Sequence, residues 1–256
     1  MAKKRFTILS GPSCVGKGPL IAALNRFHPD VEYTPIRVIK SRESRLNGPR
    51  PEEKAIWKNP DYFRPMVEIL ELSGNPQYLI GDCLGLPQAV DLSQIRKTEA
   101  ELFFIEIYHT IGAELAKKIT YLTNVDITTV FVAPIGRQEI EDLGSAGVDL
   151  AEYLTWIMIH KQMVRARYQR KTVDVALVKD IRGRAEDTIS ELRSGTGYSH
   201  VIVNHDGEGS TNWHRLSSGI FTTKPEGDAG RAVSTLSHIL GGSEAAEAEN
   251  WNGLNL

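Results

Sequence analysis

Short apolar runs alternate with helical patterns from the first residues of the chain onward. Arg5–Ser10 is an apolar run that ends at Gly11 and Pro12, which is typical of a buried strand. Pro19–Phe27 carries apolar side chains at helical spacing, and its proline lies in the first turn, where a helix tolerates it. A strand, a glycine-containing turn and a helix in this order are the opening of an α/β fold.

Three further strands are predicted later in the chain, at Leu102–Tyr108, Thr129–Ala133 and His200–Asn204. A helical pattern follows each of them, and these patterns lie at Gly112–Ile119, Arg137–Leu143 and Ala229–Leu240. Strands that alternate with helices indicate crossover connections. The pattern therefore predicts an α/β protein with a parallel sheet.

The stretches between these elements differ in character. Residues 33–91 are rich in Pro, Arg and Glu and contain only short apolar runs, whereas residues 136–184 hold long helical patterns. One of these patterns, Leu150–Lys171, is strongly basic in its second half. Residues 242–256 are small and acidic, so we expect a frayed helix or disorder there, with Trp251 docking on the body of the protein or on a partner.

Composition limits the classes of function. The chain has 256 residues, of which 24% are charged, and its net charge is −2. This balance argues against a protein that mainly neutralises nucleic-acid phosphates or coats an anionic membrane. Cys14 and Cys83 are too few for a disulfide framework or a Cys-rich metal site. With no apolar stretch of about 18 residues and no signal-peptide pattern, we expect a soluble, cytoplasmic protein that binds neither nucleic acid nor membranes.

A phosphate-binding pattern follows the first strand. Gly11-Pro-Ser-Cys-Val-Gly16-Lys17 fits G-x-x-x-x-G-K, in which backbone N–H groups surround phosphate oxygens and the lysine reaches the β- and γ-phosphates. The alternative is a Gly-rich turn with an exposed lysine, but a strand before and a helix after the motif favour phosphate binding. Gly18 stands where the pattern has Ser or Thr, so the hydroxyl that contacts Mg²⁺ is missing.

This motif and several later segments of the chain resemble those of the guanylate kinases. The run ILSGPSCVGKGPLIAAL is similar to the family's ILSGPSGVGKGTLIKAL, and MVEILELSGN resembles its F-[IL]-E-x-A-x-x-x-G-N. FFIEIY stands where the family has a strand that ends in L-D-[IV]-D, and Arg184, Glu191 and Tyr198–Asn204 fit R-x6-E-x6-Y-[DE]-x-x-[IV]-[IV]-N. The resemblance implies a P-loop kinase three-layer fold with a parallel sheet, an acceptor-binding insertion and a helical lid. It divides one domain, 1–256, into a core (1–32, 92–135, 185–241), an acceptor region (33–91), a lid (136–184) and a tail (242–256).

The resemblance also assigns an acceptor site. In that family, two arginines clamp the acceptor phosphate and a tyrosine also binds it. A glutamate accepts hydrogen bonds from the edge of the base, and an acid at the end of a strand holds Mg²⁺ or ordered water. These residues are Arg42, Arg45, Glu68, Tyr78, Glu106 and Tyr108, of which Glu106 is also the metal ligand, directly or through water. Tyr108 replaces the family's second acid, so the preferred base stays open. A solvated loop for the arginines and a structural role for Glu68 or Tyr78 are the alternatives.

On the donor side, the resemblance implies contacts with ATP from the residues Gly11, Ser13, Cys14, Val15, Gly16, Lys17, Gly18 and Asn204. Lys17 is also catalytic, and Arg167, Arg170 and Arg184 are the lid arginines that would neutralise the transferring phosphoryl group. Without the resemblance, arginines at helical spacing indicate a solvated helix face.

The resemblance implies a nucleoside monophosphate kinase, with ATP and Mg²⁺ as donor and cofactor and a (d)NMP such as GMP as acceptor. Two other functions stay open. One is a related kinase for another nucleotide or phosphorylated small molecule, because guanine-reading groups such as the second acid are missing. The other is a kinase-derived binding module without activity, because Gly18 and Pro19 follow Lys17. The sequence is compatible with a monomer or a homodimer.

Overall fold

The computed structural model describes residues 4–41, 64–97, 99–122, 125–216 and 218–256. The chain divides into two compact units, and each unit is formed by two segments of the chain. The first unit comprises the chain up to Ser10 together with Glu32–Thr129. The second unit comprises Gly11–Val31 and Val130–Leu256, so it contains the Gly-rich motif and the predicted lid region.

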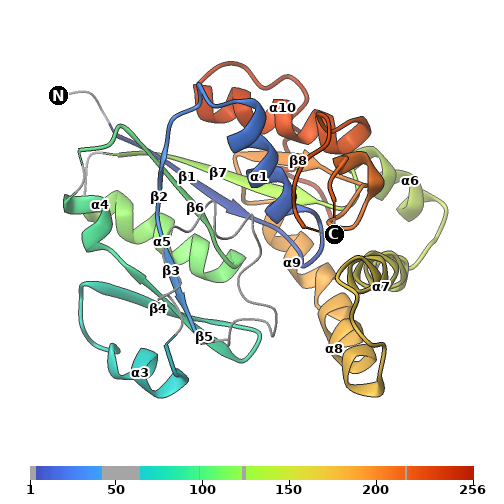
Figure 1. The fold of residues 1–256 in the computed structure, drawn as a ribbon, viewed down its shortest axis with the longest axis horizontal. Coiled ribbons are helices and arrows are strands. Elements are labelled where there is room, and N and C mark those ends of the chain that lie inside the picture. The colour runs from blue at the N-terminus through green and yellow to red at the C-terminus, as the bar shows by residue number, and fades with distance from the viewer. Residues whose placement is uncertain (1–3, 42–63, 98, 123–124, 217) are drawn as a thin grey trace. The chain divides into compact units, whose positions relative to one another are not determined.

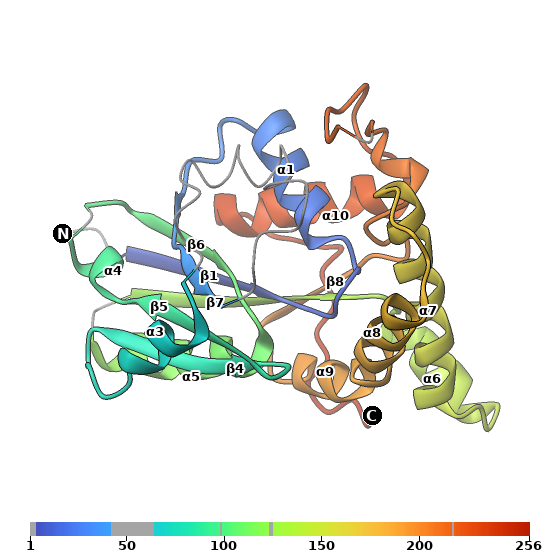
Figure 2. The same cartoon turned by 60° about the horizontal axis from the view of Figure 1, so that its bottom comes forward.

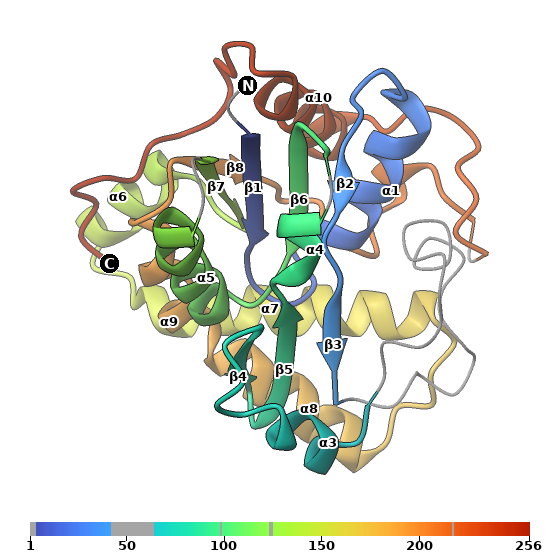
Figure 3. The same cartoon turned by 90° about the vertical axis from the view of Figure 1, so that its left-hand side faces the viewer.

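Strands β2 (Thr34–Pro35), β6 (Leu102–Glu106) and β1 (Lys4–Ser10) lie side by side in the first unit (Figures 1 and 3). The strands β1 and β6 are parallel, with Leu9 opposite Glu106. The middle and end of β1 are buried, as expected for a parallel strand that is covered on both faces. This register places the Glu106 carboxylate at the carboxyl end of its strand, the edge where α/β proteins bind ligands.

In the second unit, the end of β7 (Val125–Ala133) pairs in parallel with β8 (His200–Val203). The strand order of the five-stranded sheet is β2-β6-β1-β7-β8. The predicted α/β class with a parallel sheet is therefore confirmed, and each of the four strands expected from the apolar runs is present.

The first unit also holds a three-stranded antiparallel sheet in the order β3-β5-β4, within a stretch where the sequence pattern predicted no strand (Figure 3). Its strands are β3 (Val38–Lys40), β4 (Tyr78–Cys83) and β5 (Leu86–Asp91), and the helices of this unit are α3 (Met66–Glu71), α4 (Ser93–Lys97) and α5 (His109–Leu122). One hydrophobic core joins α5 to strands of both sheets, including Phe6, Val90 and Leu115.

The helices of the second unit are α1 (Lys17–Phe27), α6 (Arg137–Ser145), α7 (Leu150–Tyr168), α8 (Val175–Glu186), α9 (Thr188–Gly195) and α10 (Gly227–Gly241), together with a short 3₁₀ turn, η1 (Thr211–Trp213). Helix α1 packs beside α10, and α7 packs against both α8 and α9 (Figures 1 and 2). In the described part of the chain, no helix is both long and apolar enough to span a bilayer.

The prediction that residues 242–256 are frayed or disordered is wrong. Trp251 is fully buried and its ring lies against Phe131, while its indole N–H donates to Glu249 over 2.6 Å. The backbone of Glu249 pairs with Val201 at the edge of β8. The tail therefore docks on its own unit, because one tryptophan buries enough apolar surface to order a segment whose local composition is small and acidic.

The predicted elements differ from the observed ones mainly at their ends. Helix α7 ends at Tyr168 rather than Lys171, and β6 ends at Glu106 rather than Tyr108. The strand stops early because α5 begins at His109, which leaves only two residues for the connection.

Candidate active site

The Gly-rich loop, Gly11–Gly18, runs from the end of β1 to the first turn of α1. The Val15 N–H group turns back to the Pro12 carbonyl, 3.5 Å away. Cys14 and Gly16 have φ angles of 73° and 99°, which belong to the left-handed region of the backbone. Left-handed residues in such a turn are typical of the nests in which successive N–H groups surround an anion.

Several N–H groups of this loop are available to a ligand. Among the residues that the structure describes, no acceptor faces the backbone N–H groups of Ser13, Gly16, Lys17 and Gly18. Helix α1 begins at Lys17, so the positive end of its dipole lies at the same place. Free N–H groups at a helix N-terminus are the arrangement that binds phosphate in many nucleotide-binding proteins.

The Lys17 ammonium lies over the loop that it would serve. Its Nζ donates to the carbonyl of Gly11 over 2.5 Å and to that of Pro12 over 2.9 Å. Both acceptors are neutral carbonyls, so the charge of Lys17 is not neutralised by an ion pair within the described residues. A phosphate can replace these carbonyls as the partner of the ammonium at little cost.

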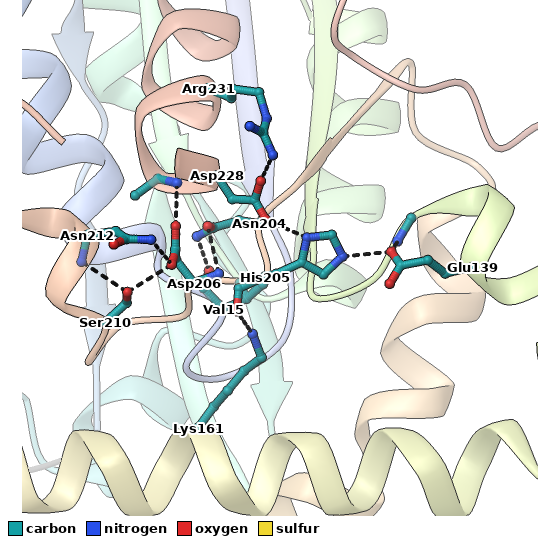
Figure 4. Close-up of polar contacts among 12 residues, drawn as sticks. Val15, Glu139, Lys161, Asn204, His205, Asp206, Ser210, Asn212, Asp228 and Arg231 are labelled. Carbon is teal, nitrogen blue, oxygen red and sulfur yellow. Dashed lines mark hydrogen bonds and ion pairs between the residues drawn. The ribbon is translucent and has the colours of Figure 1, made fainter. Parts of the chain in front are cut away.

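A second segment, Asn204–Glu208, holds the loop from outside and is called the β8 loop from here on. The buried Asn204 side chain donates from Nδ2 to the Val15 carbonyl over 2.7 Å (Figure 4). The Glu208 N–H group donates to the Cys14 carbonyl over 2.9 Å. These two bonds occupy carbonyls of the Gly-rich loop and leave its N–H groups available. Asn204 therefore contacts the Gly-rich loop itself, and its contact with the nucleotide stays a prediction.

The predicted lid arginines occupy two different settings. Arg167 and Arg170 are exposed at the end of α7, and Arg170 has a φ angle of 52°, so the chain turns there. Arg184 lies on α8, where its Nε donates to Asp180 over 2.8 Å and its side chain is 23% exposed. Arg167 and Arg170 have no ion-pair partner among the described residues, which leaves their guanidinium groups available to an anionic ligand.

Glu191 is a buried acid whose carboxyl group lies close to the cations Lys17 and Arg184. It lies on α9 with 3% of its surface exposed, between Thr188 and Gly195 on the buried face of the helix. Burial raises the pKa of its carboxyl group to about 7; Lys17 and Arg184 counteract this shift, and Asp187 adds to it. The motif spacing contained Glu191, but only the tertiary structure shows that its charge is close to Lys17.

Replacing Glu191 by glutamine is expected to stabilise the protein in a pH-dependent way. Because the folded-state pKa is raised from 4.5 to about 7, the folded chain retains a proton that the unfolded chain loses as the pH rises between these values. Wild-type stability therefore falls over this window and stays lower above it, by on the order of 3 kcal/mol. In urea unfolding, E191Q should exceed wild type at pH 8 and match it near pH 4.5. A difference that does not change with pH would contradict this assignment.

A second buried charge lies below the Gly-rich loop. Lys161 on α7 is 9% exposed, and its Nζ donates to the carbonyl of His205 (Figure 4). Burial lowers the pKa of this ammonium group to about 8, against the opposing effect of Asp206. No sequence pattern singled out this residue, because the apolar side chains of α7 are distributed around the helix and their spacing does not indicate which face is buried.

The acceptor residues proposed from the sequence lie in the first unit. Glu68 is on α3 and forms an exposed ion pair with Arg64 at 3.7 Å, and Tyr78 is half-buried at the start of β4. Glu106 is half-buried at the end of β6, and its carboxylate has no hydrogen bond or ion pair within the described ranges. Arg42 and Arg45 lie outside the described residues.

Tyr108 lines a shallow pocket of about 340 Å³ in the first unit. Its other lining residues are Gly81, Asp82, Leu84, Thr110, Ile111 and Glu114. The lining contains two carboxylates and no basic side chain, so it suits hydrogen-bond donors of a ligand better than phosphate oxygens. Of the four described acceptor candidates, only Tyr108 contributes to this pocket.

Magnesium would find few protein ligands here. Gly18 supplies no hydroxyl, and the described residues contain no cluster of three or more His, Cys, Asp or Glu side chains that could hold a metal ion. Mg²⁺ usually keeps several waters and binds through substrate phosphates and one or two carboxylates rather than through a protein cage. The unengaged carboxylate of Glu106 fits such a role.

Comparisons with known proteins relate the whole arrangement to one family. No family model matches the chain. A guanylate kinase from Trichodesmium erythraeum (strain IMS101) is 28% identical over 200 residues, which cover 75% of this chain and 95% of that protein. A guanylate kinase from Synechococcus sp. (strain JA-3-3Ab) is 26% identical over 141 residues, 54% of this chain and 58% of that protein.

These similarities support a divergent member of the guanylate kinase family. The crystal structure of guanylate kinase from Anaplasma phagocytophilum shares the fold, with a TM-score of 0.51 and 13% identity over 94% of this chain and 86% of that one. The low identity agrees with the departures from the family pattern at Gly18 and Tyr108.

Proposed function

We propose that the protein is a nucleoside monophosphate kinase that transfers the γ-phosphoryl group of ATP to a (d)NMP such as GMP. The observation that carries this proposal is the Gly-rich loop, in which the N–H groups of Ser13, Gly16, Lys17 and Gly18 are unengaged at the start of α1. Within the described ranges, the Lys17 ammonium beside them has only carbonyl partners. Similarity to the two cyanobacterial guanylate kinases supports the same assignment.

The loop residues would position the donor. Backbone N–H groups of the Gly-rich loop would hold the β-phosphate, and Lys17 would move from the Gly11 and Pro12 carbonyls to the β- and γ-phosphates. Arg167, Arg170 and Arg184 would neutralise the charge that spreads over the transferring group. The acceptor phosphate is already anionic, so no general base is needed and catalysis consists of positioning and charge stabilisation.

The acceptor would be held by residues of the first unit. Arg42 and Arg45 would bind its phosphate with Tyr78, while Glu68 and Tyr108 would contact the nucleoside. Mg²⁺ that arrives with ATP would shield the phosphate charges, and Glu106 would hold it through a bound water. Asn204 would contribute indirectly, by fixing the Val15 carbonyl.

A kinase with a different acceptor is the second candidate. It is favoured by Tyr108, which lines the pocket in place of a carboxylate, and by the two acids Asp82 and Glu114 in the same lining. These groups would accept hydrogen bonds from an amino-bearing ligand. A binding module without transferase activity is the third candidate, because Gly18 and Pro19 remove the hydroxyl that usually contacts the metal.

A panel of nucleoside monophosphates separates these functions. ADP formation from ATP should be measured with GMP, AMP, CMP, UMP and sugar phosphates, and thermal unfolding should be followed with each monophosphate and a non-hydrolysable ATP analogue. We expect GMP-dependent ADP formation and a raised unfolding temperature, since a ligand at 100 times its Kd adds about 2.7 kcal/mol to stability. ADP formation with another acceptor alone would support the second candidate. Stabilisation without ADP formation would support the third, and no response to any nucleotide would contradict all three.

A further inference from the structure

Helix α7 contacts the Gly-rich loop directly. The thiol of Cys14 lies 3.8 Å from the backbone carbonyl of Lys161, to which it donates. Cys14 also packs with Met158, which is fully buried one turn earlier on α7. The loop therefore rests on this helix, although the two segments lie more than 140 residues apart in the chain.

The same helix holds the β8 loop through two cationic side chains. Lys161 Nζ donates to the His205 carbonyl, and Arg165, one turn later on the same face, forms an ion pair with Glu208 at 3.2 Å. The side chains of Arg165 and Glu208 are 12% and 9% exposed. The Lys161 stem passes close to Gly207, where an added Cβ would meet its Cγ and Cδ at 3.3 Å. Gly207 has a φ angle of 63°, so the β8 loop follows a path that favours glycine beside the lysine.

The β8 loop in turn fixes the Gly-rich loop through two hydrogen bonds. Asn204 donates to the Val15 carbonyl and the Glu208 N–H group donates to the Cys14 carbonyl, on either side of the His205 carbonyl that Lys161 holds. Figure 4 shows Lys161 rising from α7 to this segment, with Asn204 and Val15 next to it. A shift of the β8 loop would release both carbonyls, and the curl of the Gly-rich loop would change with them.

We propose that Lys161 is a positioning residue for nucleotide binding: its buried ammonium holds the β8 loop, which keeps the N–H groups of the Gly-rich loop directed at the phosphates. The proposal rests on the proposed function, because it assumes that the Gly-rich loop binds a polyphosphate. Lys161 itself bonds protein atoms, so its effect passes through His205 and Asn204. Its positive charge also lies below the site that receives the phosphates.

A purely structural role would not need this ammonium. Lys161 has no ion-pair partner among the described residues; Asp206 and Glu139 favour its charged form only from a distance, and burying an ammonium costs stability. The lowered pKa of Lys161 expresses the same cost. A methionine would fill the same space without the cost of a buried charge. The charge is therefore explained by the hydrogen bond to the His205 carbonyl and by the phosphates, not by the packing of α7.

The test compares Lys161→Met and Lys161→Arg with wild type. Binding of inorganic tripolyphosphate and of ATP is measured by calorimetry at pH 7, and thermal unfolding of each protein is recorded under the same conditions. K161M should bind both ligands at least tenfold more weakly without a lower unfolding temperature. K161R keeps the charge and donor groups and should bind more tightly than K161M. Lys117→Met, which removes an exposed lysine on α5, is the matched control and should bind like wild type.

The outcomes separate this proposal from the proposed function. If wild type binds neither ligand, the proposed function fails. If wild type binds and K161M binds equally well, or if K161M loses affinity only in proportion to a lowered unfolding temperature, the role of Lys161 is overturned. Should K161M not fold, Lys161→Gln, which removes the ammonium charge but keeps a polar side chain at this position, replaces it in the test. It should weaken tripolyphosphate binding severalfold, and unchanged affinity would overturn the proposal.

Discussion

Lys17→Ala is expected to lower the rate of phosphoryl transfer a hundredfold or more while the fold persists, an effect on the order of that seen when one preorganised donor is removed from an active site. Among the described residues, the Lys17 ammonium bonds only the Gly11 and Pro12 carbonyls, so the variant breaks no ion pair that the structure shows. Initial rates of ADP formation at saturating ATP and acceptor measure the loss, and circular dichroism verifies the fold.

Lys117→Met provides the control for the removal of a lysine charge, since this exposed residue lies on α5. It should retain wild-type turnover. Lys17→Arg keeps the charge but not the compact ammonium, so it should recover only part of the activity. Full activity of K17A would mean that this lysine does not contact the transferred group, and the assignment of the Gly-rich loop as the donor site would then be wrong.

Gly11→Ala is expected to destabilise the protein strongly and to remove nucleotide binding. An added Cβ at this residue would lie 2.3 Å from the carbonyl oxygen of Val132, which belongs to a buried strand, and the φ angle of 143° is itself unfavourable for alanine. Overpacking against backbone costs about 1–3 kcal/mol or more, because neither β7 nor the loop can move without losing other contacts. Urea unfolding measures the stability, and calorimetry with tripolyphosphate measures the binding.

Gly147→Ala isolates the contribution of backbone conformation. Gly147 also has a positive φ angle, 71°, but no heavy atom lies within 4 Å of its added Cβ. This variant should lose only about 1 kcal/mol, which is the cost of the left-handed conformation for a residue with a side chain. Equal losses in the two variants would show that contact with Val132 does not determine the effect at Gly11.

The local pattern of apolar residues was sufficient to predict the strand and the helix on either side of the Gly-rich loop. The apolar run Arg5–Ser10, the glycines after it and the helical spacing of Pro19–Phe27 predicted β1, the loop and α1, because each signal depends on residues a few positions apart. The same reasoning predicted β6, β7 and β8. It found no strand in residues 33–91, because β3 has only three residues, while polar residues, a glycine and a proline interrupt the apolar side chains of β4 (YLIGDC) and β5 (LPQAVD).

The spacing of the motif predicted the residues of the Gly-rich loop but not the side chains that fix the conformation of this loop. Asn204 was placed near the nucleotide from a motif, whereas its amide bonds the Val15 carbonyl across 189 residues of chain. Lys161 gave no signal, because its burial follows from the packing of α7 on the β8 loop. The docking of Trp251 could not be predicted from an acidic tail, since it depends on a hydrophobic cluster that includes Phe131 and Tyr198.

The sequence by itself determined the α/β class, the Gly-rich loop with its lysine, and the family that they indicate. These features are local, so the residues that produce them are neighbours in the chain. The tertiary structure alone decided which charges are buried beside the loop, above all Lys161 and Glu191, and how the tail docks. Burial and electrostatic proximity arise only when distant segments pack together, and no spacing within one segment encodes them.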